Sequence, residues 1–285
     1  MHAASGPSRF VVQVGAHEHH RGGHDIVPQL IRRGWHALLV EPQPNLASKL
    51  RTLYANATEQ VRVVEVAVCP GSQTSISLWV LNGTETLGSN HSDIRCLGRE
   101  TFVSAIASLN RAHVQRFQGQ YYLTPNQCRR CSIKLNRPLP PNCMRHVFNH
   151  NIREKKVRCA SIVDTIQEHQ HGAPDFLVID AEGAEATVLQ QYFASGLRLP
   201  ARIRYEKTYM GPEVHHNITT HLRSRGMEIS LHGRMDVEFS SSASSDLFPA
   251  AVMTRTLAHT PSKRRGKRGG PHSSVRKVRP ALKNT

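Results

Sequence analysis

The stretch Asp175-Phe-Leu-Val-Ile-Asp180-Ala-Glu-Gly-Ala-Glu185 decides the fold class of this 285-residue chain. Its apolar run, residues 176–179, is typical of a strand that is buried on both faces of a parallel sheet. Asp180 follows this run directly, at the carboxyl end of the predicted strand, where open α/β sheets bind their ligands. Glu182 and Glu185 are three residues apart and would share one face of the following helix. The stretch therefore predicts an acidic cluster at the ligand-binding edge of a sheet.

A similar arrangement opens the chain. Residues 9–14 predict a first strand that runs into a glycine turn at Gly15, and residues 34–41 predict a second strand that ends on Glu41. A strand, a glycine turn, a helix and a second strand ending on an acid form a nucleotide-binding pattern, in which the acid accepts hydrogen bonds from a ribose diol. The glycine motif that cradles phosphates is incomplete, so the pattern does not predict a phosphate-binding loop.

The remaining sequence continues to alternate between strands and helices. We predict a helix at 45–55, strands at 61–68 and 74–81, a strand and helix start at 157–167, a helix at 184–195, a strand at 201–206, a helix at 213–225 and an antiparallel pair at about 227–233 and 246–252. This order predicts an α/β fold with a mostly parallel seven-stranded sheet, an antiparallel terminal strand and helices on both faces. Residues 82–156 are polar and irregular, and we interpret them as an insertion that caps the active-site end.

Several motifs in this order match those of one family. They are Val14-Gly15-Ala16, Glu41-Pro42, the run Ile179-Asp180-Ala181-Glu182-Gly183-Ala184-Glu185, a later strand that ends on Glu206, and Asp246-Leu247. Over about residues 9 to 252 the chain resembles the FkbM-like family of S-adenosylmethionine-dependent methyltransferases. The resemblance implies a Rossmann-like class I methyltransferase fold over 8–253, with S-adenosylmethionine as the cofactor.

The resemblance also implies which residues bind the cofactor. Gly15 and Ala16 would lie against its methionine part, and Glu41 would hold its ribose. Gln13 stands where the family often carries an acid, and we include it among the cofactor-binding residues. His19 stands where the family usually repeats a glycine, and its Cβ and imidazole would crowd the approach of the backbone to the cofactor.

The predicted catalytic residues are carboxylates. By the same resemblance, Asp180 would face the reacting centre and also contact the cofactor, Glu182 is the next candidate, and Glu206 would line the acceptor side. A hydroxyl acceptor benefits from a base that removes its proton. For Glu185 we expect only an ordinary stabilising position in the first turn of a helix.

Three functions are compatible with these features. The first is an O-methyltransferase that acts on a hydroxyl of a sugar or a small metabolite. The second is a nucleotide-binding oxidoreductase, which the missing G-x-G-x-x-G motif disfavours. The third is a non-catalytic module that keeps the fold and docks on nucleic acid or another polyanion through a basic tail.

The insertion carries a second pattern, in which C-x2-C and C-x2-H are separated by eleven residues. Four side chains in this spacing can hold a tetrahedral structural zinc ion: Cys128, Cys131, Cys143 and His146. Cys159 would be an alternative fourth ligand. Reduced cysteines without a metal, or a disulfide in an oxidising compartment, remain alternatives.

Charge is concentrated at the end of the chain. The formal net charge is +16, and residues 254–285 contain ten Lys or Arg and no acid. This composition predicts a disordered basic tail with nonspecific affinity for polyanions. We see no signal sequence and no run of about 20 apolar residues that could span a bilayer, so we predict no membrane contact. The predicted location is cytoplasmic, with a nuclear alternative through the basic run 263–268.

Overall fold

The computed structural model describes residues 9–17, 19, 25–81, 107–120, 128–130, 132–133, 136, 138, 152–169, 172–233 and 235–242. The chain divides into one unit of residues 1–247 and a second of residues 248–285, and all described residues belong to the first unit. The basic tail predicted at 254–285 lies outside the described residues. Among the described residues, no helix is long and apolar enough to cross a membrane.

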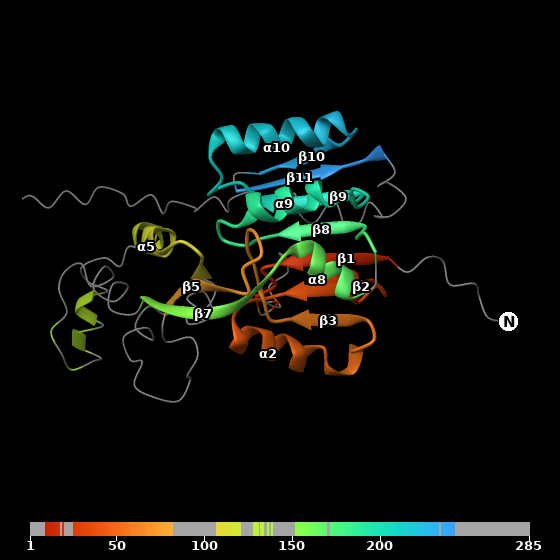
Figure 1. Ribbon diagram of the computed structural model, residues 1–285. Coiled ribbons are helices and arrows are strands. Elements are labelled where there is room, and N and C mark those ends of the chain that lie inside the picture. The colour runs from red at the N-terminus through yellow and green to blue at the C-terminus, as the bar shows by residue number, and fades with distance from the viewer. Residues whose placement is uncertain are drawn as a thin grey trace, which may run out of the picture. The chain divides into compact units, whose positions relative to one another are not determined.

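A seven-stranded sheet forms the centre of the first unit, in the order β10-β11-β9-β8-β1-β2-β3 (Figure 1). Its strands are β1 (Phe10–Val14), β2 (His36–Val40), β3 (Val61–Val64), β8 (Phe176–Ile179), β9 (Arg202–Glu206), β10 (Glu228–His232) and β11 (Asp236–Ser240). Neighbouring strands from β9 to β3 are parallel, whereas β11 is antiparallel to both β9 and β10. The chain therefore has an α/β fold with a mixed sheet, and its antiparallel strand β11 lies inside the sheet, one position from the edge.

Helices cover both faces of this sheet. One face packs against α8, α9 and α10 in a continuous apolar core that includes Val12 and Val14 of β1. Successive side chains of a strand point to opposite faces, so the fully buried Val11 faces the other side. The buried residues of α1 and α2 lie outside the first core and cover that other side. The bounds are α1 (Val27–Ile31), α2 (Pro44–Leu53), the 3-10 helix η1 (Ala55–Ala57), α8 (Ile162–Glu168), α9 (Glu185–Ala194) and α10 (Pro212–Ser224).

A second sheet has the order β4-β7-β5-β6. Its strands are β4 (Ala67–Val68), β5 (Ser75–Leu81), β6 (Ala107–Ser108) and β7 (Ile152–Ala160), and the helix α5 (Arg111–Gln120) follows β6. The sequence predicted β5 at 74–81, but β7 begins five residues before the strand predicted to start at Val157. This extension is long because β7 pairs with β5 along the whole length of β5.

The prediction of the last strand was wrong. The partner of β10 is Asp236–Ser240, and not 246–252, which lies outside the described residues. Its Val237, Glu238 and Phe239 are all buried, so it lacks the alternation of a half-buried strand. Glu238 is buried because it forms an ion pair with Arg202 and accepts a hydrogen bond from Ser230. This pairing compensates for the buried charge and could not be inferred from the sequence pattern.

The cysteines of the described residues form disulfides. Cys69, which follows β4, is bonded to Cys159 in β7, so Cys159 cannot be the alternative zinc ligand. Cys128 is also disulfide-bonded, which is incompatible with a thiolate ligand of zinc at this position. The remaining predicted ligands, Cys131, Cys143 and His146, lie outside the described residues. The structure therefore supports the disulfide alternative at Cys128 and gives no support to zinc. Disulfides persist in oxidising compartments, and the cytoplasmic location stays a prediction.

Removing the Cys69–Cys159 bond is expected to destabilise the fold. The bond closes a loop with a sequence separation of 90 residues, and a cross-link over such a loop stabilises by about 4 kcal/mol through the entropy of the unfolded chain. We expect the variant with both Cys69→Ala and Cys159→Ala to melt about 10 °C lower in a thermal scan without reductant. Equal melting temperatures of the wild type and the double variant would contradict the presence of this disulfide.

Candidate functional site

Four of the predicted site residues form one row across the sheet. The register aligns Val14 of β1 with Val40 of β2 and with Ile179 of β8, and Ile179 with Tyr205 of β9. The next residue along each of these strands is therefore at the same level. In the order β9, β8, β1 and β2 these residues are Glu206, Asp180, Gly15 and Glu41. The chain leaves β1 towards β2 on one side and returns to β8 on the other, and open α/β sheets bind ligands at such a switch point.

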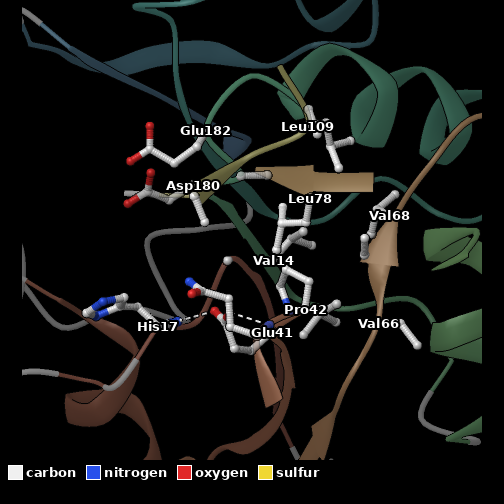
Figure 2. Close-up of a pocket in the computed structure, with 17 residues that line it drawn as sticks. Val14, His17, Glu41, Pro42, Val66, Val68, Leu78, Leu109, Asp180 and Glu182 are labelled. Atoms are coloured by element: carbon white, nitrogen blue, oxygen red, sulfur yellow. Dashed lines mark hydrogen bonds between the residues drawn. The ribbon is translucent and has the colours of Figure 1, made fainter. Parts of the chain in front are cut away.

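Two cavities meet at this row. One has a volume of about 240 Å³ and the other of about 360 Å³, and both are lined by Gly15, His17 and Asp180. The smaller cavity is mostly apolar, and residues of both sheets line it. Val14 belongs to β1, Val66 lies between β3 and β4, and Leu78 belongs to β5. Figure 2 shows these apolar side chains on one side of the cavity and the carboxylates of Asp180 and Glu182 together on the other. Gln13, Ala16 and His19 line the larger cavity.

Residue 15 must be glycine because its backbone lies against the end of β8. Its φ is +79°, which side chains with a Cβ rarely adopt, and an added Cβ would lie 1.8 Å from the carbonyl oxygen of Asp180. The amides of Gly15 and Ala16 both donate hydrogen bonds to the carbonyl of Val40, at 2.9 and 3.1 Å. The turn after β1 is therefore fixed against both β2 and β8, and only glycine fits at its first position.

Glu41 is almost completely buried, and it holds the loops on either side of it. Oε2 accepts a hydrogen bond of 2.8 Å from the amide of His17, and Oε1 accepts one of 2.9 Å from the amide of Gln43 (Figure 2). Each carboxylate oxygen retains another lone pair, so Glu41 can still accept hydrogen bonds from a ligand in the smaller cavity. Burial raises the pKa of Glu41 to about 7, although the two amides oppose this shift.

Gln13 and His19, the two departures from the family pattern, are bonded to each other. His19 Nε2 lies 2.7 Å from Gln13 Oε1, and His19 Nδ1 lies 2.7 Å from the hydroxyl of Tyr54. His19 has a φ of +46°, the left-handed conformation that glycine adopts most readily. Its buried imidazole is thus held by partners on both ring nitrogens. Of the other histidines of this loop, His20 and His24 lie outside the described residues.

The three predicted catalytic carboxylates come together. Asp180, Glu182 and Glu206 each have an oxygen within 4.8 Å of the other two. Glu182 reaches this position because the turn after β8 is left-handed at Glu182, with φ +49°, and at Gly183, with φ +105°. Glu185 has a different role, since its buried carboxylate accepts hydrogen bonds from the amides of Ala181 and Gly183 and so fixes the turn.

Desolvation, and then the repulsion among these carboxylates, shifts their protonation towards the neutral form. Desolvation raises the pKa of Asp180 to about 7, and neighbouring acids, led by Glu185, add to the shift. Solvent still reaches Asp180 in the open crevice, so its shift reflects enclosure by the walls and not complete burial. Desolvation and the charge of Asp180 raise the pKa of Glu182 to about 9, and desolvation raises the pKa of Glu206 to about 7. Such shifts are common at functional sites.

Ser108 and His113 also contact this site, and the sequence did not point to them. The hydroxyl of Ser108 donates a 2.7 Å hydrogen bond to the carbonyl of Glu182, and His113 Nε2 lies 3.5 Å from Glu182 Oε2. Both residues are buried and lie within residues 82–156, for which the sequence predicted no helices or strands. Neither residue belongs to a motif. The sequence therefore predicted only that residues 82–156 as a whole cap the active-site end.

The comparisons with known proteins give one family. Residues 13–229 match the family model described as the methyltransferase FkbM domain. The chain is similar to a solved structure titled "Human methyltransferase 10 domain containing protein", with 11% identity and a TM-score of 0.35 over 85% of this chain and 75% of that chain. No curated protein matches the chain. Because the family match spans most of the chain and confirms the resemblance seen in the motifs, this chain belongs to the FkbM methyltransferase family.

Proposed function

We propose that the chain is an S-adenosylmethionine-dependent methyltransferase whose acceptor is a hydroxyl group of a sugar or a small metabolite. The observation that carries this proposal is the row at the strand ends, in which Glu41 borders an apolar cavity and Asp180 stands at the junction with the acidic cluster. The oxidoreductase alternative lacks its glycine motif, and the alternative of docking on a polyanion depends on residues 254–285, outside the described part of the chain.

The residues of the site fit S-adenosylmethionine. Glu41 offers the free lone pairs that a ribose diol needs, and the walls formed by Val66, Val68 and Leu78 suit the faces of an adenine ring. Gly15 keeps the turn close to β8, where any Cβ would collide with Asp180. When bound, the cofactor supplies an electrophilic methyl group for an in-line displacement.

The remaining work of the enzyme is alignment, exclusion of water and movement of one proton. Leu78 of β5 and Leu109, the residue after β6, line the smaller cavity with apolar surface, which disfavours water beside a bound ligand. The acceptor hydroxyl must lose its proton as its oxygen forms the new bond to carbon. Asp180, whose pKa lies near 7, is the group proposed to accept this proton.

Binding of S-adenosylhomocysteine to a Glu41→Gln variant tests the cofactor half of the proposal. The amide keeps the shape of the side chain but loses the charge that strengthens hydrogen bonds to the ribose. We expect calorimetric titration to show affinity reduced about 10 to 100-fold, corresponding to about 1.4–2.7 kcal/mol. The matched control is Glu65→Gln, since Glu65 pairs with Arg51 and lines neither cavity. Equal weakening by both variants would contradict a ribose contact at Glu41.

The same titration has an expected pH dependence. The carboxylate of Glu41 is a better acceptor than the protonated acid, and its pKa lies at about 7 in the free protein. Ligand binding favours the ionised form, so affinity should rise as the pH rises from 6 to 8. Glu41→Gln should flatten this rise, and a variant that retains the full rise would rule out Glu41 as its source.

A further inference from the structure

We propose that Asp180, Glu182 and Glu206 form a binding site for a hard divalent cation, Mg²⁺ or Mn²⁺, which holds the acceptor hydroxyl. The cation site stands on the geometry of these carboxylates alone, whereas its role towards the acceptor rests on the function proposed above.

The backbone brings the three ligands together from neighbouring elements. β8 and β9 are parallel neighbours, and the register of Ile179 with Tyr205 places Asp180 beside Glu206 at the ends of these strands. Glu182 comes from the turn between β8 and α9, and one oxygen of each carboxylate lies within 4.8 Å of the other two. Ligands fixed by strand ends and by a hydrogen-bonded turn are held in place before any ion binds.

One carboxylate of the cluster keeps a buried oxygen that makes no hydrogen bond with the described residues. Glu206 is only 5% exposed, and although Thr208 forms a hydrogen bond with its side chain, its Oε1 accepts none from this part of the chain. Glu182 Oε2 also accepts none there, and the ring nitrogen of His113 lies 3.5 Å from it. A buried acceptor without a hydrogen bond costs free energy, so Oε1 of Glu206 indicates an absent ligand.

No cationic side chain of the described residues neutralises the cluster. Arg204 lowers the pKa of Asp180, but its guanidinium pairs with Asp236 at 3.1 Å. His113 Nε2 lies 3.5 Å from Glu182 Oε2 and would offset one charge of the three, and only when protonated. A divalent cation would therefore favour the ionised form of the three carboxylates and balance the charge that the side chains around them balance only in part.

The donor set also selects the kind of cation. Oxygen-only carboxylate ligands suit Mg²⁺, Mn²⁺ and Ca²⁺, whereas zinc and copper favour nitrogen and sulfur ligands. Three protein ligands leave coordination positions open for water and for one acceptor oxygen. A hydroxyl bound to such a cation ionises more easily: its O–H bond breaks and the proton passes to the oxygen of Asp180 that does not hold the cation. The oxygen then bonds to the methyl carbon as the sulfur–methyl bond breaks.

Titration of the full chain with Mn²⁺, followed by electron paramagnetic resonance, tests the site without any assay of activity. We expect saturable binding by the wild type, and binding weakened at least about 10 to 100-fold in Glu206→Gln, which keeps the shape of the ligand. The control is Glu213→Gln, because Glu213 is exposed on α10 and belongs to no described acidic cluster. Absence of saturable binding by the wild type, or equal binding by Glu206→Gln, would overturn the proposal.

Two further measurements exclude misfolding and separate this proposal from the proposed function. Without metal, Glu206→Gln should melt no lower than the wild type, because it relieves repulsion among buried carboxylates, but it should lose the gain in melting temperature that Mn²⁺ gives the wild type. Binding of S-adenosylhomocysteine in EDTA, together with no Mn²⁺ binding, would overturn the cation site and leave the methyl donor in place. Mn²⁺ binding without S-adenosylhomocysteine binding would support the site and contradict the proposed function.

Discussion

Gly15→Ala is expected to cost about 3 kcal/mol of folding free energy and to abolish binding of S-adenosylhomocysteine. The alanine must hold a φ near +79°, and its Cβ would lie 1.8 Å from the carbonyl oxygen of Asp180. The collision is with backbone, so it can be relieved only if β1 and β8 move apart. Because these strands carry both halves of the site, the separation that relieves the clash also opens the cofactor-binding turn.

A second glycine separates the cost of the left-handed backbone from the cost of the collision with Asp180. Gly34 has a φ of +86°, but an added Cβ there would meet nothing within 4 Å. Gly34→Ala should therefore lose only the folding free energy needed to hold alanine in a left-handed conformation, about 1–2 kcal/mol. It should retain ligand binding. Thermal unfolding and calorimetry of the two variants provide the comparison. If Gly15→Ala is no less stable than Gly34→Ala, the close contact of Gly15 with Asp180 does not exist in the protein.

Asp180→Asn is expected to reduce kcat for methyl transfer about 10² to 10⁴-fold. The amide cannot accept the acceptor's proton, and it is a poor replacement for a carboxylate in contact with a cation. Neutralising one member of the acidic cluster should not reduce stability, because desolvation and the acids around Asp180 already raise its pKa. The measurement is formation of S-adenosylhomocysteine with the first acceptor that reacts in a panel of sugars and small hydroxylated metabolites.

The control for this loss is an aspartate of a helix that covers the sheet. Asp164 is exposed in the first turn of α8, so Asp164→Asn should leave kcat unchanged. For Asp180→Asn, the affinity for S-adenosylhomocysteine should stay within about tenfold of wild type, which separates a chemical role from a binding role. A kcat that survives in Asp180→Asn would remove Asp180 from the reacting centre.

The row of site residues could be predicted from the sequence because strand ends define it. Gly15, Glu41, Asp180 and Glu206 each lie at the end of a predicted strand, and parallel strands bring such positions to one edge of a sheet. The same kind of argument failed for the last strand, because burial of Glu238 depends on its ion pair with Arg202. Local patterns describe elements well but do not show which charges are compensated elsewhere in the fold.

Other parts of the site depend on contacts between distant segments. Ser108 bonds to a carbonyl 74 residues later in the chain, and no motif marks either end of this contact. The sequence showed that Gln13 and His19 both depart from the family pattern, but not that they pair with each other. That pairing requires the left-handed backbone of His19, which turns the imidazole towards Gln13 and Tyr54.

The most direct test of the central claim is calorimetric titration of the folded full chain with S-adenosylhomocysteine, with NAD⁺ as the control ligand. We expect one molecule of S-adenosylhomocysteine to bind per chain with a dissociation constant on the order of micromolar, a free energy of about −8 kcal/mol, and NAD⁺ not to bind. Failure of a folded protein to bind S-adenosylhomocysteine, or equal binding of NAD⁺, would contradict the assignment of this crevice to a methyl donor.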